Sequence, residues 1–231
     1  PLAIDFYLPS FPALALAFDT DTEHVQLSLA SYFAGLAIGQ LVYGPLADRF
    51  GRRTPLLVGV SLFTLASLAC AVAPSLEWLI AARFVQALGG CAGMVISRAV
   101  VRDLCDPISS AKVFSQLMLV MGLAPILAPV AGGLLLNAFG WPAIFVCLTL
   151  FSAACLVALS LWLPETLNPS VQPPPLSGAL REYRRLFGDL PFIGHALTGG
   201  LAIAGMFAYI AGSPFVFIEL YGVPAEHYGW P

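Results

Sequence analysis

The longest uncharged stretch of the chain limits the folds that are open to it. From Val113 to Pro164 there is no Asp, Glu, Lys or Arg. A membrane-spanning helix needs about 20 largely apolar residues, so this stretch is long enough for two of them. Residues 137–142, which contain the Gly and Pro typical of a turn, divide it. The sequence therefore predicts two membrane crossings joined by a short connection.

The composition excludes several other classes of protein. Hydrophobic residues make up 59% of the 231 residues and charged residues only 10%, against about 25% in a soluble domain. So few charges cannot cover a soluble enzyme, and a nucleic-acid-binding protein would carry a basic excess. The cysteines have no metal-ligand spacing and resemble buried apolar residues. No catalytic triad or phosphate-binding motif occurs, so we expect no enzyme, no cofactor, no metal and no nucleic-acid partner.

Other apolar segments complete an all-α, polytopic membrane fold. They are long enough for five more crossings, which gives seven in total, although the first could be truncated. Transmembrane strands are excluded because no segment alternates polar and apolar residues. The five further segments are residues 1–18, 25–47, 54–76, 78–101 and 190–218.

The basic residues predict how the chain is oriented. Eight of the ten Lys and Arg fall in alternate connections, and the remaining connections carry only acidic charges. The positive-inside rule places the basic connections in the cytoplasm. The basic residues concerned are Arg49, Arg52, Arg53, Arg102, Lys112, Arg181, Arg184 and Arg185.

One connection differs from the others. Residues 164–190 are rich in proline and then become basic and aromatic, which is typical of a linker followed by an amphipathic helix at the membrane surface. We therefore expect a bundle of six helices in residues 1–163, a cytoplasmic linker in residues 164–190, and the start of a second bundle in residues 191–231.

Two charged residues lie where the bilayer makes charge costly. Asp5 falls inside the first apolar segment, and a carboxylate there is a candidate proton or cation site facing a water-filled cavity. The alternative is that Asp5 lies near the inner interface. Arg83 falls inside the fourth segment, and Gln86, one turn on, shares its face. Arg83 either lines a polar surface with Gln86 or extends to the outer interface.

The second connection carries the most specific motif. It reads Gly44-Pro-Leu-Ala-Asp48-Arg-Phe-Gly51-Arg52-Arg53. The glycines permit a tight turn and close helix approach, and Asp48 and Arg52 can pair if the helix continues through them. This segment resembles the signature G-x-L-A-D-R-x-G-R-[RK] of the major facilitator superfamily.

Two further motifs agree with this resemblance in order and position. Leu79-x-x-x-Arg83-x-x-Gln86-x-x-Gly89 is similar to the arginine motif of the family's fourth helix. A second segment resembles the fifth-helix motif associated with antiporters, except that Ala128 replaces a glycine before Pro129. Its prolines bend a helix and its glycines let a neighbour approach. The residues of that motif are Gly122, Pro125, Pro129, Gly132 and Gly133.

Within the superfamily the chain resembles the bicyclomycin-resistance (Bcr/CflA) drug/proton antiporters. The segments that carry this resemblance begin at Asp5, Arg98 and Gly212. It implies a twelve-helix transporter, of which this chain would hold the N-terminal six helices and the seventh. The absence of an initial Met and of a polar C-terminal tail agrees with a fragment.

The resemblance implies a multi-pass protein of the bacterial inner membrane that is monomeric when full length. It would export small amphipathic drugs in exchange for protons, with no other cofactor. Asp5, Tyr7, Arg83 and Gln86 would form the proton and substrate site. A cytoplasmic gate would be formed by Gly44, Asp48, Gly51, Arg52, Arg53 and Asp103. The alternatives are a seven-helix membrane receptor and a carrier of the same superfamily for an endogenous metabolite.

Overall fold

The computed structural model describes residues 2–167 and 176–223, and these residues form helices joined by short connections. Within these two stretches there is no β-strand, as the sequence predicts. The elements are α1 (Leu2–Asp5), η1 (Leu8–Ser10), α2 (Phe11–Ala17), α3 (Thr22–Phe50), α4 (Arg53–Ala71), α5 (Leu76–Leu104), α6 (Pro107–Phe139), α7 (Pro142–Trp162), α8 (Leu176–Phe187), α9 (Leu190–Pro214) and the π-helical turn η2 (Phe215–Leu220).

Five helices, α3 to α7, are long and apolar enough to cross a membrane. They match five of the seven predicted crossings, so the all-α, multi-span prediction is confirmed for this part of the chain. The segment predicted as the seventh crossing forms α9, which follows α8 at a bend of 81°. This bent pair counts as a sixth span only if α8 and α9 are taken together.

The first apolar segment differs in form from the other crossings. It is shorter than the other spans and is broken between α1 and α2. Pro9 and Pro12 lie at the starts of η1 and α2. Proline lacks the N–H that continues a helix, which accounts for new starts at these positions. The break brings the chain around Tyr7 into the centre of the bundle.

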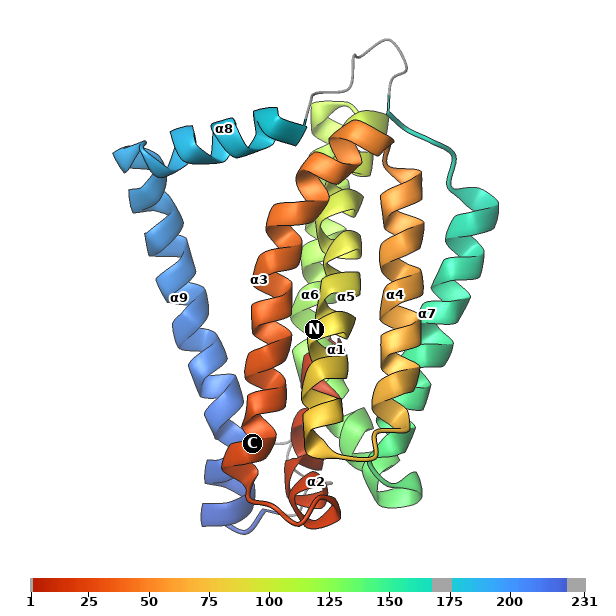
Figure 1. The fold of residues 1–231 in the computed structure, drawn as a ribbon, viewed down its shortest axis with the longest axis vertical. Coiled ribbons are helices and arrows are strands. Elements are labelled where there is room, and N and C mark those ends of the chain that lie inside the picture. Colours follow the sequence, from red (N-terminus) through yellow and green to blue (C-terminus); the bar gives the residue numbers. More distant parts are fainter. Residues whose placement is uncertain (1, 168–175, 224–231) are drawn as a thin grey trace.

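Helix α5 lies at the centre of the packing, between α3 and α4, while α4 also packs on α7 (Figure 1). Helix α6 packs on α1 and η1. Helix α9 stands apart from α3 to α7 and is joined to them across one end by α8 (Figure 1). Most of its described side chains are exposed. The buried core therefore lies within the first 163 residues.

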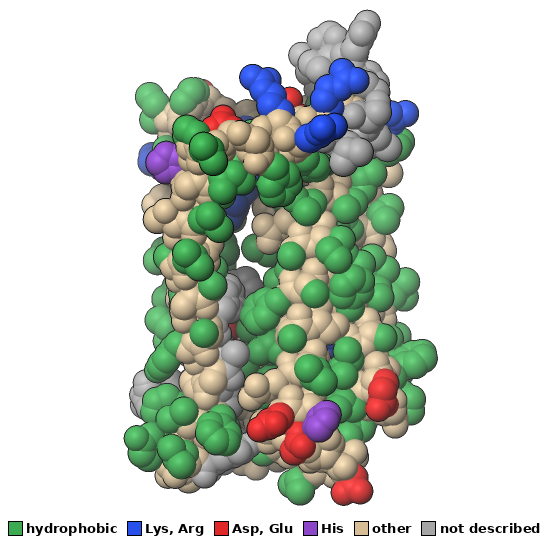
Figure 2. All heavy atoms as spheres, turned by 60° about the vertical axis from the view of Figure 1, so that its left-hand side comes forward, with side chains coloured by type: hydrophobic (Ala, Val, Ile, Leu, Met, Phe, Trp, Pro, Cys, Tyr) green, Lys and Arg blue, Asp and Glu red, His purple; other side chains and the backbone are tan. Residues whose placement is uncertain are grey.

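Charged side chains are distributed unevenly between the two ends of the bundle. On the face in Figure 2, Lys and Arg gather at the end where α8 lies, and most Asp and Glu lie at the opposite end. We call these the basic end and the acidic end. Asp21, at the acidic end, accepts a hydrogen bond from the His24 backbone N–H, which caps α3 and lowers the pKa of the carboxyl.

Candidate functional site

Arg83 is a fully buried cation in the middle of the protein. It lies on α5, and its side chain has no exposed surface. The guanidinium carbon lies 4.6 Å from the ring centre of Tyr7 and 4.1 Å from that of Tyr32. A third ring, that of Phe145 on α7, lies 5.9 Å away. Cation–π attraction to these rings offsets part of the cost of removing the charge from water.

The hydrogen bonds of Arg83 are incomplete. Its Nη1 donates to Gln86 Oε1 at 2.6 Å, and Gln86 Nε2 donates to Ser67 Oγ at 2.7 Å. This chain links α5 to α4. The Nε and Nη2 of Arg83 are buried without a partner in the described part of the protein. A buried donor without an acceptor is costly, so this position favours an acceptor or a negative charge.

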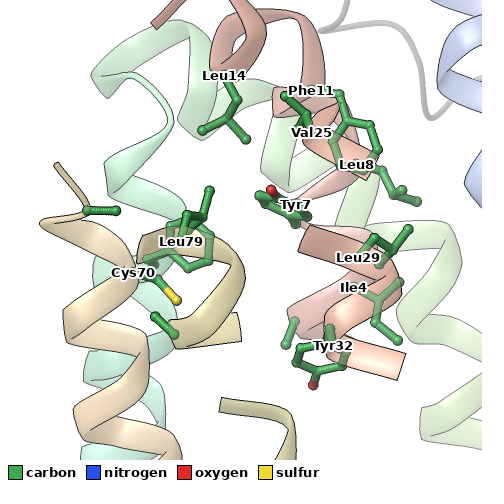
Figure 3. Packing of buried hydrophobic residues seen from close by; sticks show 14 of the residues in the cluster. Ile4, Tyr7, Leu8, Phe11, Leu14, Val25, Leu29, Tyr32, Cys70 and Leu79 are labelled. Carbon is green, nitrogen blue, oxygen red and sulfur yellow. The ribbon is translucent and has the colours of Figure 1, made fainter. Parts of the chain in front are cut away.

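Tyr7 connects the first segment to this site. Its ring is fully buried and packs on Phe11 and Phe145, with ring centres 5.2 and 5.5 Å away. Its hydroxyl is 2.6 Å from Ser28 Oγ on α3. Figure 3 shows Tyr7 pointing from the broken first segment towards Cys70 of α4 and Leu79 of α5. Tyr7 is therefore part of the packed core.

Asp5 lies at the end of α1, two residues before Tyr7, and is 4% exposed. In the two described stretches, no Lys or Arg is within ion-pair distance of its carboxylate. Asp5 and Arg83 are thus both buried. Asp5 is near Tyr7 in the sequence, and Arg83 contacts the Tyr7 ring, but Asp5 and Arg83 form no ion pair with each other. The predicted residues Asp5, Tyr7, Arg83 and Gln86 occupy one region of the bundle.

A second group of charges lies at the basic end. Arg52 donates from Nη1 to Asp48 Oδ1 at 2.6 Å and from Nε to Asp103 Oδ2 at 2.9 Å. We call these three residues the gate cluster. From the sequence we expected Asp48 and Arg52 to pair only if one helix continued through both. In the structure α3 ends at Phe50, and Arg52 directly precedes α4. The pair forms across the turn instead, and Asp103 joins it from the end of α5.

Glu165, which sequence reasoning missed, completes this end of the molecule. Burial acts to raise the pKa of its carboxyl, but backbone N–H donors outweigh burial and the pKa lies below its ordinary value. This contact therefore stabilises the fold above the ordinary pKa and is lost as the pH falls through the lowered one. The donors are the N–H groups of Arg52, Arg53, Thr166 and Leu167. An acidic residue directly after an apolar span was the available signal.

The remaining gate residues have separate roles. Gly51 has a φ of +85°, a backbone conformation that favours glycine, and it lies against the Glu165 carboxylate. Arg53 Nη2 donates to the Ser160 carbonyl oxygen at 2.7 Å, which ties α4 to the end of α7. A Cβ on Gly44 would meet nothing within 4 Å. Gly44 is therefore not a close helix contact in this structure.

The fifth-helix motif divides into two parts on α6. Pro129, Gly132 and Gly133 are buried, while Gly122 and Pro125 are exposed. A Cβ on Gly132 would collide with the Phe6 carbonyl oxygen. The motif glycine therefore lets α6 approach the backbone at the break in the first segment, next to Asp5 and Tyr7.

The aromatic partners of Arg83 were only partly visible in the sequence. Tyr7 belongs to the predicted site, whereas Tyr32, Phe145 and Ser67 do not. No local motif marks these positions, because three different helices bring them together. In the described residues, no group of three His, Cys, Asp or Glu side chains could hold a metal ion.

Known proteins resemble the whole of this chain. It is 43% identical over 229 residues to the "Uncharacterized MFS-type transporter YdgK" of Bacillus subtilis. The aligned region covers 98% of this chain and 57% of that protein. The chain is 35% identical over 231 residues to the "Bicyclomycin resistance protein homolog" of Haemophilus influenzae, covering 100% and 58%. The "Multidrug resistance protein MdtL" of Escherichia coli K12 is 30% identical over 228 residues, covering 99% and 58%. The chain thus spans a little over half the length of these relatives.

The fold agrees with these relatives. The structure titled "Crystal structure of D-xylose-proton symporter" matches 99% of this chain and 61% of that chain with a TM-score of 0.65, at 16% identity. The model of the Major Facilitator Superfamily matches residues 1–231. The family model and the names of the relatives are those of transporters and resistance proteins, which agrees with the expectation that the chain is not an enzyme. The chain belongs to the major facilitator superfamily.

Proposed function

We propose that the protein is a multidrug efflux transporter that exports small amphipathic drugs across the bacterial inner membrane in exchange for protons. The names of the Haemophilus influenzae and Escherichia coli relatives, which refer to bicyclomycin and multidrug resistance, support this proposal. Membership of the superfamily favours a carrier over a seven-helix receptor. A carrier for an endogenous metabolite remains the second candidate.

The observation that carries the proposal is the burial of Asp5 in the same region as Arg83. Arg83 keeps two buried donors without partners, and Asp5 is a buried carboxyl without an ion pair among the described residues. The positive charge of Arg83 favours the ionised form of a carboxyl that approaches it. Protonation of Asp5 removes that attraction. The pair therefore offers two arrangements whose balance depends on a proton.

This balance supplies the coupling step. A proton that enters from the outside neutralises Asp5, and rearrangement of the bundle exposes the site to the cytoplasm, where the proton leaves. A drug then occupies the site and moves outward in the reverse rearrangement. Transporters of this type alternate access in this way around a site near the midplane. Aromatic rings such as those of Tyr7 and Tyr32 suit amphipathic or cationic drugs.

The domain boundaries expected from the sequence belong to the same proposal. Residues 1–163 form the first bundle, residues 164–190 the cytoplasmic linker, and residues 191–231 the beginning of the second bundle. The length ratio of 57–58% against the relatives supports this division. The drug site then lies between the two bundles of a monomer, and the basic end faces the cytoplasm.

The proposal is tested with the protein expressed from its complete gene in drug-sensitive bacteria. We expect lower accumulation of a cationic dye such as ethidium, and accumulation should return to the level of the empty vector when an uncoupler removes the proton gradient. Efflux that persists with the uncoupler would contradict proton exchange. If purified protein in proteoliposomes moves only anionic metabolites, the second candidate is correct.

The gate cluster makes a separate prediction. Asp48→Asn removes one charge from the contact with Arg52, whose side chain is only 11% exposed. Because the Asp48 side chain is 55% exposed, the expected effect is modest, about a threefold rise in the cytoplasm-open population. The measurement is the alkylation rate of a single cysteine at Gly93, on α5, in inside-out vesicles of a cysteine-free variant. Glu182→Gln on the exposed surface of α8 is the control. An unchanged rate in Asp48→Asn would remove the gate role.

A further inference from the structure

The proline of the second-connection motif leaves a backbone acceptor free in α3. Pro45 lies inside this helix and has no N–H. In an α-helix that N–H would donate to the carbonyl oxygen four residues earlier, which is that of Leu41. A backbone acceptor in such a position pairs with water or with another donor of the protein. The Leu41 carbonyl is therefore free to accept from a donor outside α3.

Tyr183 of α8 supplies this donor. Its phenolic O–H donates to the Leu41 carbonyl oxygen at 2.6 Å, across 142 positions of sequence. The oxygen that Pro45 leaves without a helical partner is thus the one that Tyr183 reaches. A hydroxyl replaces the missing amide, and the distance is that of a short O–H···O bond.

The position of α8 gives this contact its importance. Helix α8 extends from α3 to α9 across the basic end, and it meets α9 at 81° (Figure 1). Its basic side chains Arg181, Arg184 and Arg185 are exposed. Among the described residues, the bond from Tyr183 is the hydrogen bond that joins α8 to α3. In this part of the chain, the Tyr183 hydroxyl therefore gives the placement of α8, and through it the start of α9, a directional contact with α3.

The electrostatic surroundings keep Tyr183 in its donor form. Burial and the negative charge of Asp48 raise the pKa of Tyr183. The hydroxyl thus stays protonated over the physiological range. Asp48 lies on α3 two turns after Leu41, and it pairs with Arg52 of the gate cluster at 2.6 Å.

We propose that Tyr183 is the positioning residue that docks the linker helix α8 on the proline break of α3, so that the segment leading into α9 is held against the helix that carries Asp48. The proline and the tyrosine act as a pair: one opens the acceptor and the other occupies it. This proposal stands on the described contacts alone and does not require drug or proton transport.

The test is hydrogen–deuterium exchange of the whole purified protein in nanodiscs, resolved by peptide. We expect Tyr183→Phe to speed amide exchange in residues 181–187 by about fivefold, the effect of one hydrogen bond. Tyr209→Phe makes the same chemical change in α9 and should leave exchange in residues 181–187 unchanged. Unchanged exchange in Tyr183→Phe would overturn the proposal.

A second comparison separates the docking role from a general packing role. Pro45→Ala restores the N–H that satisfies the Leu41 carbonyl within α3. In that background the further change Tyr183→Phe should speed exchange less than twofold. An effect as large as in the native background would show that the hydroxyl acts elsewhere, and would overturn the proposal. If Pro45→Ala does not fold, Pro45→Ser supplies the same N–H and the comparison is repeated with it.

Discussion

Replacing Asp5 by Asn is expected to abolish uphill drug transport while leaving downhill drug exchange intact. Asparagine keeps the size and the hydrogen-bonding ability of the side chain but binds no proton at physiological pH. Asp5 is 4% exposed and has no ion pair among the described residues, so its neutralisation removes no such contact. The variant should therefore fold and bind drug, but lose the step that couples drug movement to protons.

The expected size of this effect follows from the energy of the coupled proton. One charge moving through 100 mV releases about 2.3 kcal/mol. Since about 1.4 kcal/mol corresponds to a tenfold ratio, one proton exchanged for one uncharged drug molecule sustains a gradient of about 40-fold. In proteoliposomes with an imposed gradient of that size, the drug ratio across the membrane should fall from this value to about 1 in Asp5→Asn.

The matched control is Glu23→Gln, an exposed acidic residue in the first turn of α3. It should keep the full drug gradient. If Asp5→Asn also keeps the full gradient, Asp5 does not carry the proton. If both uphill transport and downhill exchange are lost, the charge of Asp5 is needed for folding or drug binding instead, which also contradicts the coupling role.

Substituting Gly89 by Ala is expected to destabilise the bundle strongly. Gly89 lies on α5 where it crosses α4, and a Cβ there would be 2.6 Å from the Gly59 carbonyl oxygen and would also collide with the Phe63 backbone. Backbone atoms cannot rotate away, so the two helices must separate. Overpacking of this kind costs about 1–3 kcal/mol. The thermal midpoint in detergent should fall by about 5 °C.

Gly93 provides the matched control one turn further along α5. A Cβ at this position would meet nothing within 4 Å. Gly93→Ala should therefore leave the midpoint unchanged or raise it, because alanine is favoured over glycine inside a helix by about 1 kcal/mol. Equal midpoints for the two variants would mean that the α4–α5 contact is looser than the structure indicates.

Much of the fold could be predicted from the sequence because the bilayer imposes a simple rule on length and charge. Five helices appear where apolar segments of sufficient length occur. The rule fails for the first segment, where apolar character continues from Leu2 to Ala17 but the helix is broken. A hydrophobicity pattern does not show that Pro9 and Pro12 lack backbone N–H groups. The missing N–H groups interrupt the helix at these positions.

The charged sites were predictable to different degrees. The motif that contains Asp48 and Arg52 marks the basic end, since a local pattern encodes a local turn. Glu165 joins that turn from more than 100 positions away, and Phe145 reaches Arg83 from another helix. Such contacts depend on how helices pack, and a single sequence carries no pattern for them. The contact of Tyr183 with Leu41 is also of this kind, although Pro45 indicates that a backbone acceptor of α3 lacks its helical partner.

Helix α5 connects the two charged sites as one continuous helix. It contains no proline, and it carries Arg83 about two turns from its start and Asp103 near its end. These residues are 20 positions apart, or about 30 Å along the axis. A tilt of about 5° around Arg83 would displace Asp103 by about 2.6 Å, enough to break its 2.9 Å contact with Arg52. A small tilt of α5 at the buried Arg83 would thus become a larger movement at the basic end. No chain of side-chain contacts between the two sites would be needed.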